Sequence, residues 1–106
     1  MSEFISLYIT APSREVAEKI SRAIVEEKLA ACVNIVSGAR SIYRWKGKVE
    51  AATEVIMIGK SRAALFGRLE KRVKELHHYD CPCIVAWPIE HGHPLFLDWL
   101  ADETDA

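Results

Sequence analysis

A chain of 106 residues, 50% of them apolar and 27% charged, has the composition of one folded domain, which excludes a disordered or fibrous protein. Its formal net charge of -1 provides no positive field for nucleic acid or anionic lipid, and no apolar stretch reaches the length of a membrane span. We therefore expect a single domain over residues 1–106 that binds neither nucleic acid nor membranes.

The first predicted elements are a strand and an amphipathic helix. Residues 4–10 combine β-branched and aromatic side chains and lead to Pro12, which predicts a strand that enters a turn. Ser13 is the predicted N-cap of a helix, because apolar side chains recur after it at helical spacing while charged side chains occupy the other face. The apolar face comprises Val16, Ala17, Ile20, Ala23, Ile24 and Leu29.

A long β-hairpin and a second helix follow. Residues 31–45 and 49–59 carry β-branched side chains at both parities, and Lys46-Gly47-Lys48 separates them, which predicts a hairpin. A second amphipathic helix is predicted to open at Lys60-Ser61. Its apolar face comprises Leu65, Phe66, Leu69, Val73 and Leu76.

The last predicted elements are a strand over residues 83–87, closed by Pro88, and a short helix over residues 94–101 with Pro94 at its first position. Two βα units that flank a hairpin are typical of the ferredoxin-like α+β sandwich, in which right-handed crossovers place both main helices on one face of a four-stranded antiparallel sheet. The expected fold is therefore βαββαβ, with a long central hairpin and a short C-terminal helix.

The predicted strands indicate a sheet that is covered on both faces. Residues 55–58 and 84–87 are apolar at both parities, whereas strands with one wet face alternate apolar and polar side chains. One short C-terminal helix covers an edge but not a whole sheet. Identical chains are the economical cover, so we expect a small homo-oligomer. The alternative is a sheet that curls around its own hairpin.

Several segments match, in order, the pattern of a known protein family. They are the string Leu29 to Ile35, the hairpin segment Ser41 to Lys48, and then Glu54, Lys60, His77, Tyr79, Pro82 and Pro88-Ile89. In combination they resemble the CutA divalent-cation-tolerance family, with matching spacing from Thr10 to Trp99. The resemblance implies a cytosolic homotrimer of ferredoxin-like subunits with interlocking hairpins, associated with tolerance of copper and other divalent metals.

The same resemblance leaves a second function open. The assembly of this family is similar to that of the PII signalling proteins, which implies a trimeric small-ligand sensor or signalling scaffold that binds at inter-subunit clefts as the alternative. We assign Tyr43, Trp45, Glu54, Lys60 and Tyr79 to such contacts or clefts. Tyr43 and Trp45 project to one side of the hairpin, either toward another subunit or back onto their own sheet. Glu54 and Lys60, six residues apart on one strand, lie about 20 Å apart and form no direct acid-base pair.

Histidine and cysteine gather near the C-terminus, and these side chains are preferred ligands of soft and borderline metals. The strand over residues 83–87 divides the group, because its ends lie roughly 16 Å apart. One end carries His77, His78, Cys81 and Cys83, and the other carries Glu90, His91 and His93. The first group is the preferred site for copper or another divalent metal, because two thiolates favour Cu(I) or Zn(II).

Each of these metal-ligand candidates also has a structural explanation. His77 and His78 are placed to cap the C-terminus of the second helix, and the cysteines are small enough to pack beneath the loop. The family usually has Glu where Cys83 stands, and Ile9 replaces a cysteine that some members carry, so the ligand set that the resemblance implies is incomplete in this chain.

No motif of a catalytic site appears in the sequence, so we expect a protein that is not an enzyme. The residues before the first apolar run lack the basic region of a secretory signal, and three cysteines are an odd count for a disulfide framework. These features predict a cytoplasmic protein.

Overall fold

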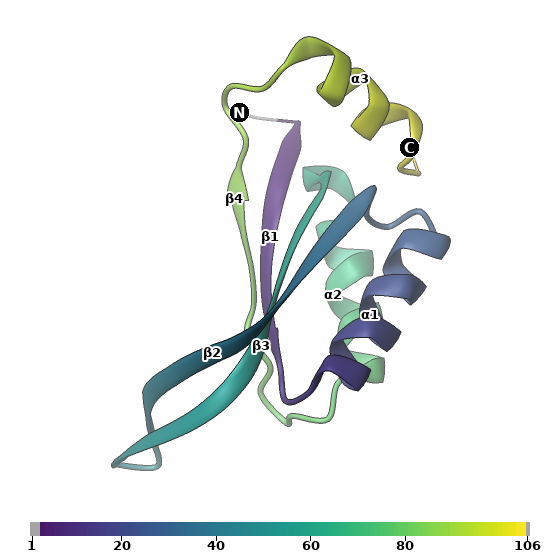
Figure 1. Ribbon diagram of the computed structural model, residues 1–106. Helices are drawn as coiled ribbons and strands as arrows, with labels where there is room; N and C mark the ends of the chain where they lie inside the picture. The colour runs from purple at the N-terminus through teal and green to yellow at the C-terminus, as the bar shows by residue number, and fades with distance from the viewer. Residues whose placement is uncertain (1–2, 106) are drawn as a thin grey trace.

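The computed structural model describes residues 3–105 and has the predicted ferredoxin-like α+β architecture, a four-stranded sheet with two helices on one face and a third helix at one end (Figure 1). The elements in chain order are β1 (Phe4–Ala11), α1 (Arg14–Glu26), β2 (Cys32–Trp45), β3 (Lys48–Arg62), a 3₁₀ turn (Ala63–Leu65), α2 (Phe66–Leu76), β4 (Ile84–Pro88) and α3 (Pro94–Asp102). No helix in this part of the chain is long and apolar enough to cross a membrane.

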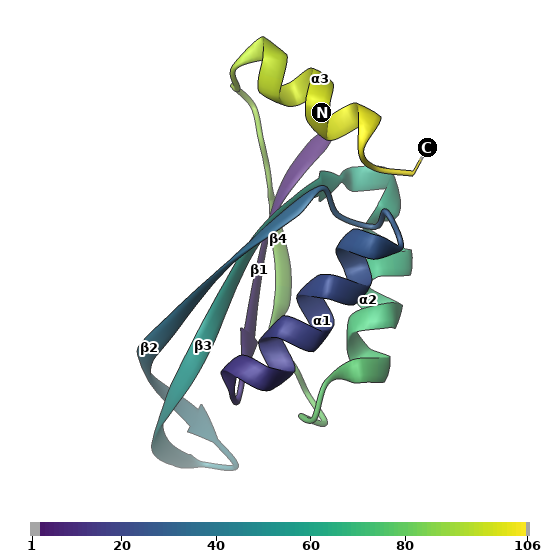
Figure 2. The ribbon, with the colours of Figure 1, turned by 45° about the vertical axis from the view of Figure 1, so that its right-hand side comes forward.

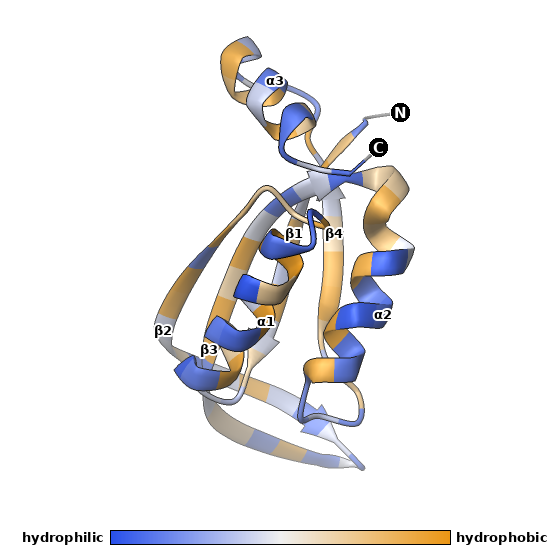
Figure 3. Ribbon diagram, turned by 90° about the vertical axis from the view of Figure 1, so that its right-hand side faces the viewer, coloured by the Kyte–Doolittle hydropathy of each residue, from blue (hydrophilic) through white to orange (hydrophobic). Residues whose placement is uncertain are grey.

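The sheet has the order β2-β3-β1-β4, and every neighbouring pair is antiparallel. β1 lies between β3 and β4, so its inward side chains form the centre of the core. Leu7 and Ile9 of β1 and Met57 of β3 are almost completely buried beneath α1 and α2. Figure 3, seen from the helical side, shows hydrophilic residues alternating with hydrophobic ones along both helices, as expected for elements with one buried face.

α1 begins where the sequence predicts. Ser13 is its N-cap, and the Ser13 hydroxyl accepts a hydrogen bond from the backbone N–H of Val16 at 3.2 Å. The helix ends at Glu26, and Lys28 then adopts the left-handed conformation with φ 62°. Leu29, predicted as part of the helical face, lies past the end of the helix but remains buried in the core.

The prediction that the second helix opens at Lys60-Ser61 is wrong. β3 continues to Arg62, and the chain enters α2 through the 3₁₀ turn at residues 63–65. Ser61 pairs with Ile5 of β1, and its buried hydroxyl donates a hydrogen bond to the Leu29 carbonyl. Pairing with strands distant in sequence therefore extends β3 past the point where local periodicity places the helix.

The β2-β3 hairpin turns at Lys46 and Gly47, which have φ values of 51° and 80°. Two left-handed residues at the centre of a turn are the requirement of a type I′ hairpin, and Gly47 meets it without strain. The hairpin extends beyond the rest of the sheet (Figures 1 and 2), and the chain measures 44 × 25 × 23 Å. The hairpin therefore does not curl over its own sheet, which excludes the alternative explanation of the apolar strands.

The sheet face opposite the helices is uncovered within one chain. We call it the open face. Its large apolar side chains are Tyr8, Val36, Ile56, Ile58, Val85 and Trp87, and the polar Ser6, Asn34 and Lys60 lie on the same face. Cross-strand pairing brings Tyr8 beside Ile58 and Val85, so these side chains form one continuous apolar surface. Trp87 is 54% exposed and Val36 is 49% exposed, which is unusual for side chains of this size on a central sheet.

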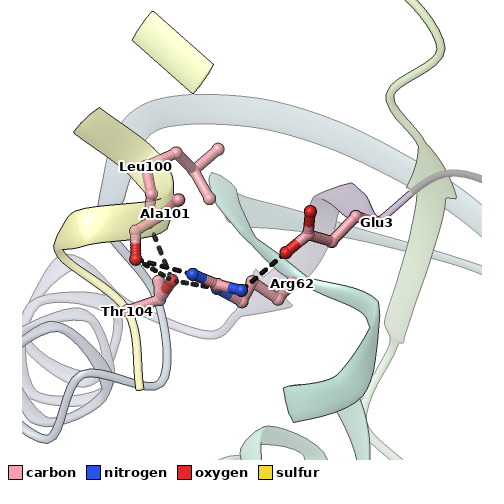
Figure 4. Close-up of polar contacts among 5 residues, drawn as sticks. All are labelled: Glu3, Arg62, Leu100, Ala101 and Thr104. Atoms are coloured by element: carbon pink, nitrogen blue, oxygen red, sulfur yellow. Dashed lines mark hydrogen bonds and ion pairs between the residues drawn. The ribbon is translucent and has the colours of Figure 1, made fainter. Parts of the chain in front are cut away.

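The guanidinium group of Arg62 fastens the C-terminal end of α3 to the end of β3 (Figure 4). It contacts Glu3 Oε2 at 2.6 Å, donates to the Ala101 carbonyl at 2.8 Å and donates to the Thr104 hydroxyl at 2.9 Å. Thr104 in turn donates to the Leu100 carbonyl at 2.8 Å. A cation is favourable at a helix C-terminus, where the last carbonyls have no partner within the helix.

We predict that Arg62→Ala lowers the free energy of unfolding by about 2 kcal/mol, because it leaves two partly buried acceptors without their charged donor. Backbone amides of residues 94–105 should exchange with deuterium faster in this variant. Arg22→Ala is the matched control, since Arg22 makes only an exposed contact with Glu18. Urea unfolding at fixed protein concentration that gives equal stability for both variants would contradict the assignment.

Candidate functional site

The loop after α2 crosses the end of β1 and is held there by His77, which is 9% exposed. The Nε2 of His77 lies 2.7 Å from the carbonyl oxygen of Thr10, and its Nδ1 accepts the backbone N–H of Tyr79 at 3.1 Å. These two partners require the neutral tautomer that carries its proton on Nε2. The imidazole therefore bonds to β1 and to its own loop rather than to the terminal carbonyls of α2.

Tyr79 extends this chain of contacts to β3. Its hydroxyl donates a hydrogen bond to Glu54 Oε2 at 2.8 Å, and its ring centroid lies 4.8 Å from that of His77. The pKa of Tyr79 is raised to about 12, mainly because the phenol is partly buried and secondly because its hydroxyl bonds to Glu54. At neutral pH the phenol therefore keeps its proton and donates a hydrogen bond to the carboxylate. We call the series Thr10, His77, Tyr79 and Glu54 the Tyr79 relay.

Tyr43 and Cys83 lie on other segments of the chain. The β2-β3 register puts Tyr43 on the same side of the hairpin as Glu54, but opposite Glu50 and therefore closer to the turn. Partial burial and the charge of Glu54 raise the pKa of the Cys83 thiol above its usual value. The thiol therefore resists the deprotonation that metal ligation requires.

The structure brings together only some of the predicted cleft residues. Glu54 and Tyr79 meet at the base of the hairpin, whereas Tyr43 pairs with Glu50 farther toward the turn, and Trp45 lies beside the turn and is 48% exposed. Lys60 lies near the other end of β3, opposite Ser6 and Cys32. Glu54 and Lys60 are thus separated along the strand, as predicted.

The predicted metal ligands do not form a complete site within one chain. His77 already uses both ring nitrogens, while His78, Cys81 and Cys83 are exposed. Across residues 3–105, no three His, Cys, Asp or Glu side chains lie close enough to hold a metal ion together. A metal bound at this loop as it stands would therefore need ligands from outside the chain. In the other candidate group, His93 occupies the N-cap position of α3 and makes no capping hydrogen bond with its side chain.

The contacts of the Tyr79 relay were not predicted from the sequence. The contact between His77 and Thr10 joins residues that are 67 positions apart, and no local pattern encodes it. The spacing of His77 and Tyr79 is the one signal that could have suggested it, because it lets an imidazole nitrogen accept the N–H two residues later.

Comparison with known proteins points to one family. Residues 5–103 match the family model described as CutA1 divalent ion tolerance protein. The divalent-cation tolerance protein CutA of Thermus thermophilus is 52% identical to this chain over 96 residues, which make up 91% of this chain and 93% of that protein.

Solved structures agree with this result. The divalent cation tolerance protein Cut A1 from Thermus thermophilus has a TM-score of 0.95 and 49% identity, covering 96% of this chain and 99% of that chain. The periplasmic divalent cation tolerance protein CutA from Archaeoglobus fulgidus has a TM-score of 0.93 and 48% identity, covering 96% of this chain and 99% of that chain.

The raised pKa of Tyr79 predicts a loss of stability at alkaline pH. A pKa that is higher in the folded protein stabilises it below the unfolded value of about 10, and this stabilisation disappears as pH rises through about 12. Tyr79→Phe should therefore show a smaller decrease in unfolding temperature over this range than wild type. Identical pH profiles for wild type and Tyr79→Phe would refute the prediction.

Proposed function

The chain belongs to the CutA1 divalent ion tolerance family, and from this premise we propose that it is a homotrimeric metal-response protein that binds divalent cations rather than an enzyme. The proposal of an assembly rests on the open face. Val36, Val85 and Trp87 of this face are about half exposed in a single chain, and burial of such side chains is favourable. Identical copies supply a matching apolar surface, and a trimer is the assembly that the family resemblance implies.

We predict that light scattering of the wild-type protein gives the mass of three chains at micromolar concentration. Trp87→Glu should shift the protein toward monomers, because the substitution buries a charge in the proposed interface. Val25→Glu is the matched control, since Val25 is a partly exposed apolar residue on α1, on the helical side of the sheet. A wild-type monomer would end the trimer proposal.

For the cation, we propose copper or another divalent metal bound at the loop after α2. The side chains of this loop support the proposal. Cys81, Cys83 and His78 are exposed and carry the sulfur and nitrogen atoms that Cu(I) and Zn(II) prefer as ligands. Assembly of several chains offers a source for the ligands that one chain lacks. Because the Cys83 pKa is raised, binding should strengthen as pH rises toward the range in which the thiol ionises.

We predict that the purified protein retains Cu(I) or Zn(II) after dialysis and that Cys81→Ser combined with Cys83→Ser abolishes this retention. Cys32→Ser is the control, since Cys32 lies within β2 opposite Lys60 and far from this loop. Elemental analysis measures the metal content of each sample. Equal content in wild type and the double variant would remove the site from consideration.

The second candidate is a PII-like trimeric sensor of a small ligand at inter-subunit clefts. The Tyr79 relay favours it, since the relay presents a fixed carboxylate and a tyrosine at the base of the hairpin. A thermal-shift screen separates the two functions, because a metal-only response supports cation tolerance and a nucleotide-only response supports the sensor.

We propose that the protein is located in the cytoplasm, because its three free thiols suit a reducing compartment.

A further inference from the structure

The outer half of the β2-β3 hairpin presents a surface of apolar and basic side chains. The register pairs Arg44 directly with Val49, so these two side chains share one face of the hairpin. Alternation along β2 adds Arg40 and Ile42 to the same face. Val49 has the same parity along β3 as the buried Val55, so this face does not belong to the open face. We call it the hairpin patch, and it comprises Arg40, Ile42, Arg44 and Val49.

α3 presents a second exposed surface, made of apolar and acidic side chains. Its members follow the i, i+3, i+4, i+7 spacing that places side chains on one face of a helix. All of them are exposed, whereas Leu100 on the other side of α3 is fully buried. We call this surface the α3 patch, and it comprises Leu95, Asp98, Trp99 and Asp102.

The two patches belong to segments of opposite charge. Residues 40–50 contain four basic side chains and one acidic side chain, whereas residues 90–105 contain five acidic side chains and neither Lys nor Arg. Within residues 3–105, none of these four basic side chains forms an ion pair, and of the five acidic ones only Asp105 does, with Arg68. The charges of both segments therefore remain free to attract a partner of opposite sign.

One chain cannot bring its own two patches together. β3 begins at Lys48 beside the hairpin turn and ends at Arg62, whose guanidinium group binds the C-terminal end of α3. Figures 1 and 2 accordingly show the hairpin and α3 at opposite ends of the molecule. The strand and the 44 Å length of the chain place the two patches roughly 40 Å apart. Only another molecule can cover either patch.

We propose that the hairpin patch of one chain docks on the α3 patch of a second copy of this chain, with Arg44 facing the carboxylates of α3. The inference rests on the proposed homotrimer and adds to the open face a second surface that joins its chains. Burial of Ile42 and Leu95, each 72% exposed in one chain, favours the contact. Opposite charges fix its direction, because two hairpin patches or two α3 patches would repel one another.

The contact is heterologous, since two different surfaces of the same chain meet. Such contacts form a ring when the rotation between neighbours closes. In a ring of three chains every hairpin patch and every α3 patch is used once, which is consistent with the proposed trimer.

Zero-length carbodiimide cross-linking tests the contact, because it joins a lysine amine only to a carboxylate that touches it. The native protein should give linked peptides in which a lysine of the hairpin turn is joined to a carboxylate of α3. A mixture of isotope-labelled and unlabelled protein establishes that the links join different chains. The lysines are Lys46 and Lys48, and the carboxylates are Asp98, Asp102 and Glu103.

The size of the assembly, measured by light scattering, separates this inference from the proposed function. Absence of these links in a protein with the mass of three chains would overturn the docking and leave the homotrimer standing. The same links in an assembly of another size would support the docking and overturn the homotrimer.

Charge reversal gives a second readout, the rate at which labelled and unlabelled oligomers exchange subunits in native mass spectrometry. Arg44→Asp and Asp98→Arg should each speed the exchange by about tenfold, because each places like charges opposite one another. A chain with both substitutions should return toward the wild-type rate, since the pair is restored with its charges exchanged. Lys19→Glu, on the exposed face of α1, is the matched control and should exchange as wild type. Equal rates for wild type and both single variants would overturn the docking.

Discussion

The apolar open face is the constraint on which the rest of the structure depends. α1 and α2 cover one side of the sheet, with Leu7, Ile9 and Met57 at the centre of the core, and leave the other side open. Val36, Val85 and Trp87 of the open face each forgo roughly 1 kcal/mol of burial free energy while they stay about half exposed. A single chain with this sheet leaves an apolar face without a cover, which is why we propose that it assembles with other copies.

The proposed assembly surface lies next to the Tyr79 relay. Glu54 continues the row of Ile56 and Ile58 along β3, so any chain that covers the open face comes close to the Tyr79 relay. One chain does not gather three metal ligands within residues 3–105. The chain belongs to a divalent ion tolerance family, and in the proposed assembly neighbouring chains would supply the ligands that one chain lacks.

Local patterns in the sequence were sufficient for the order of the elements, the Ser13 cap and the start of α3 at Pro94. They failed where structure depends on partners far along the chain. β3 extends through Ser61 because it pairs with β1, and the relay exists because His77 meets Thr10 across 67 residues. The predicted metal group stays a prediction, because one chain does not bring three of its side chains together as ligands and other copies would have to complete the site.

Solvent access to the open face is the most direct test of the central claim. Hydroxyl-radical footprinting with mass spectrometry measures how readily Trp87 is oxidised in the native protein. Trp87 is 54% exposed in one chain. We expect it to be strongly protected from oxidation in the native protein, because other copies cover it in the proposed assembly. Oxidation of Trp87 in the native protein at the rate of the unfolded chain would show that this face stands in water, and would contradict the account.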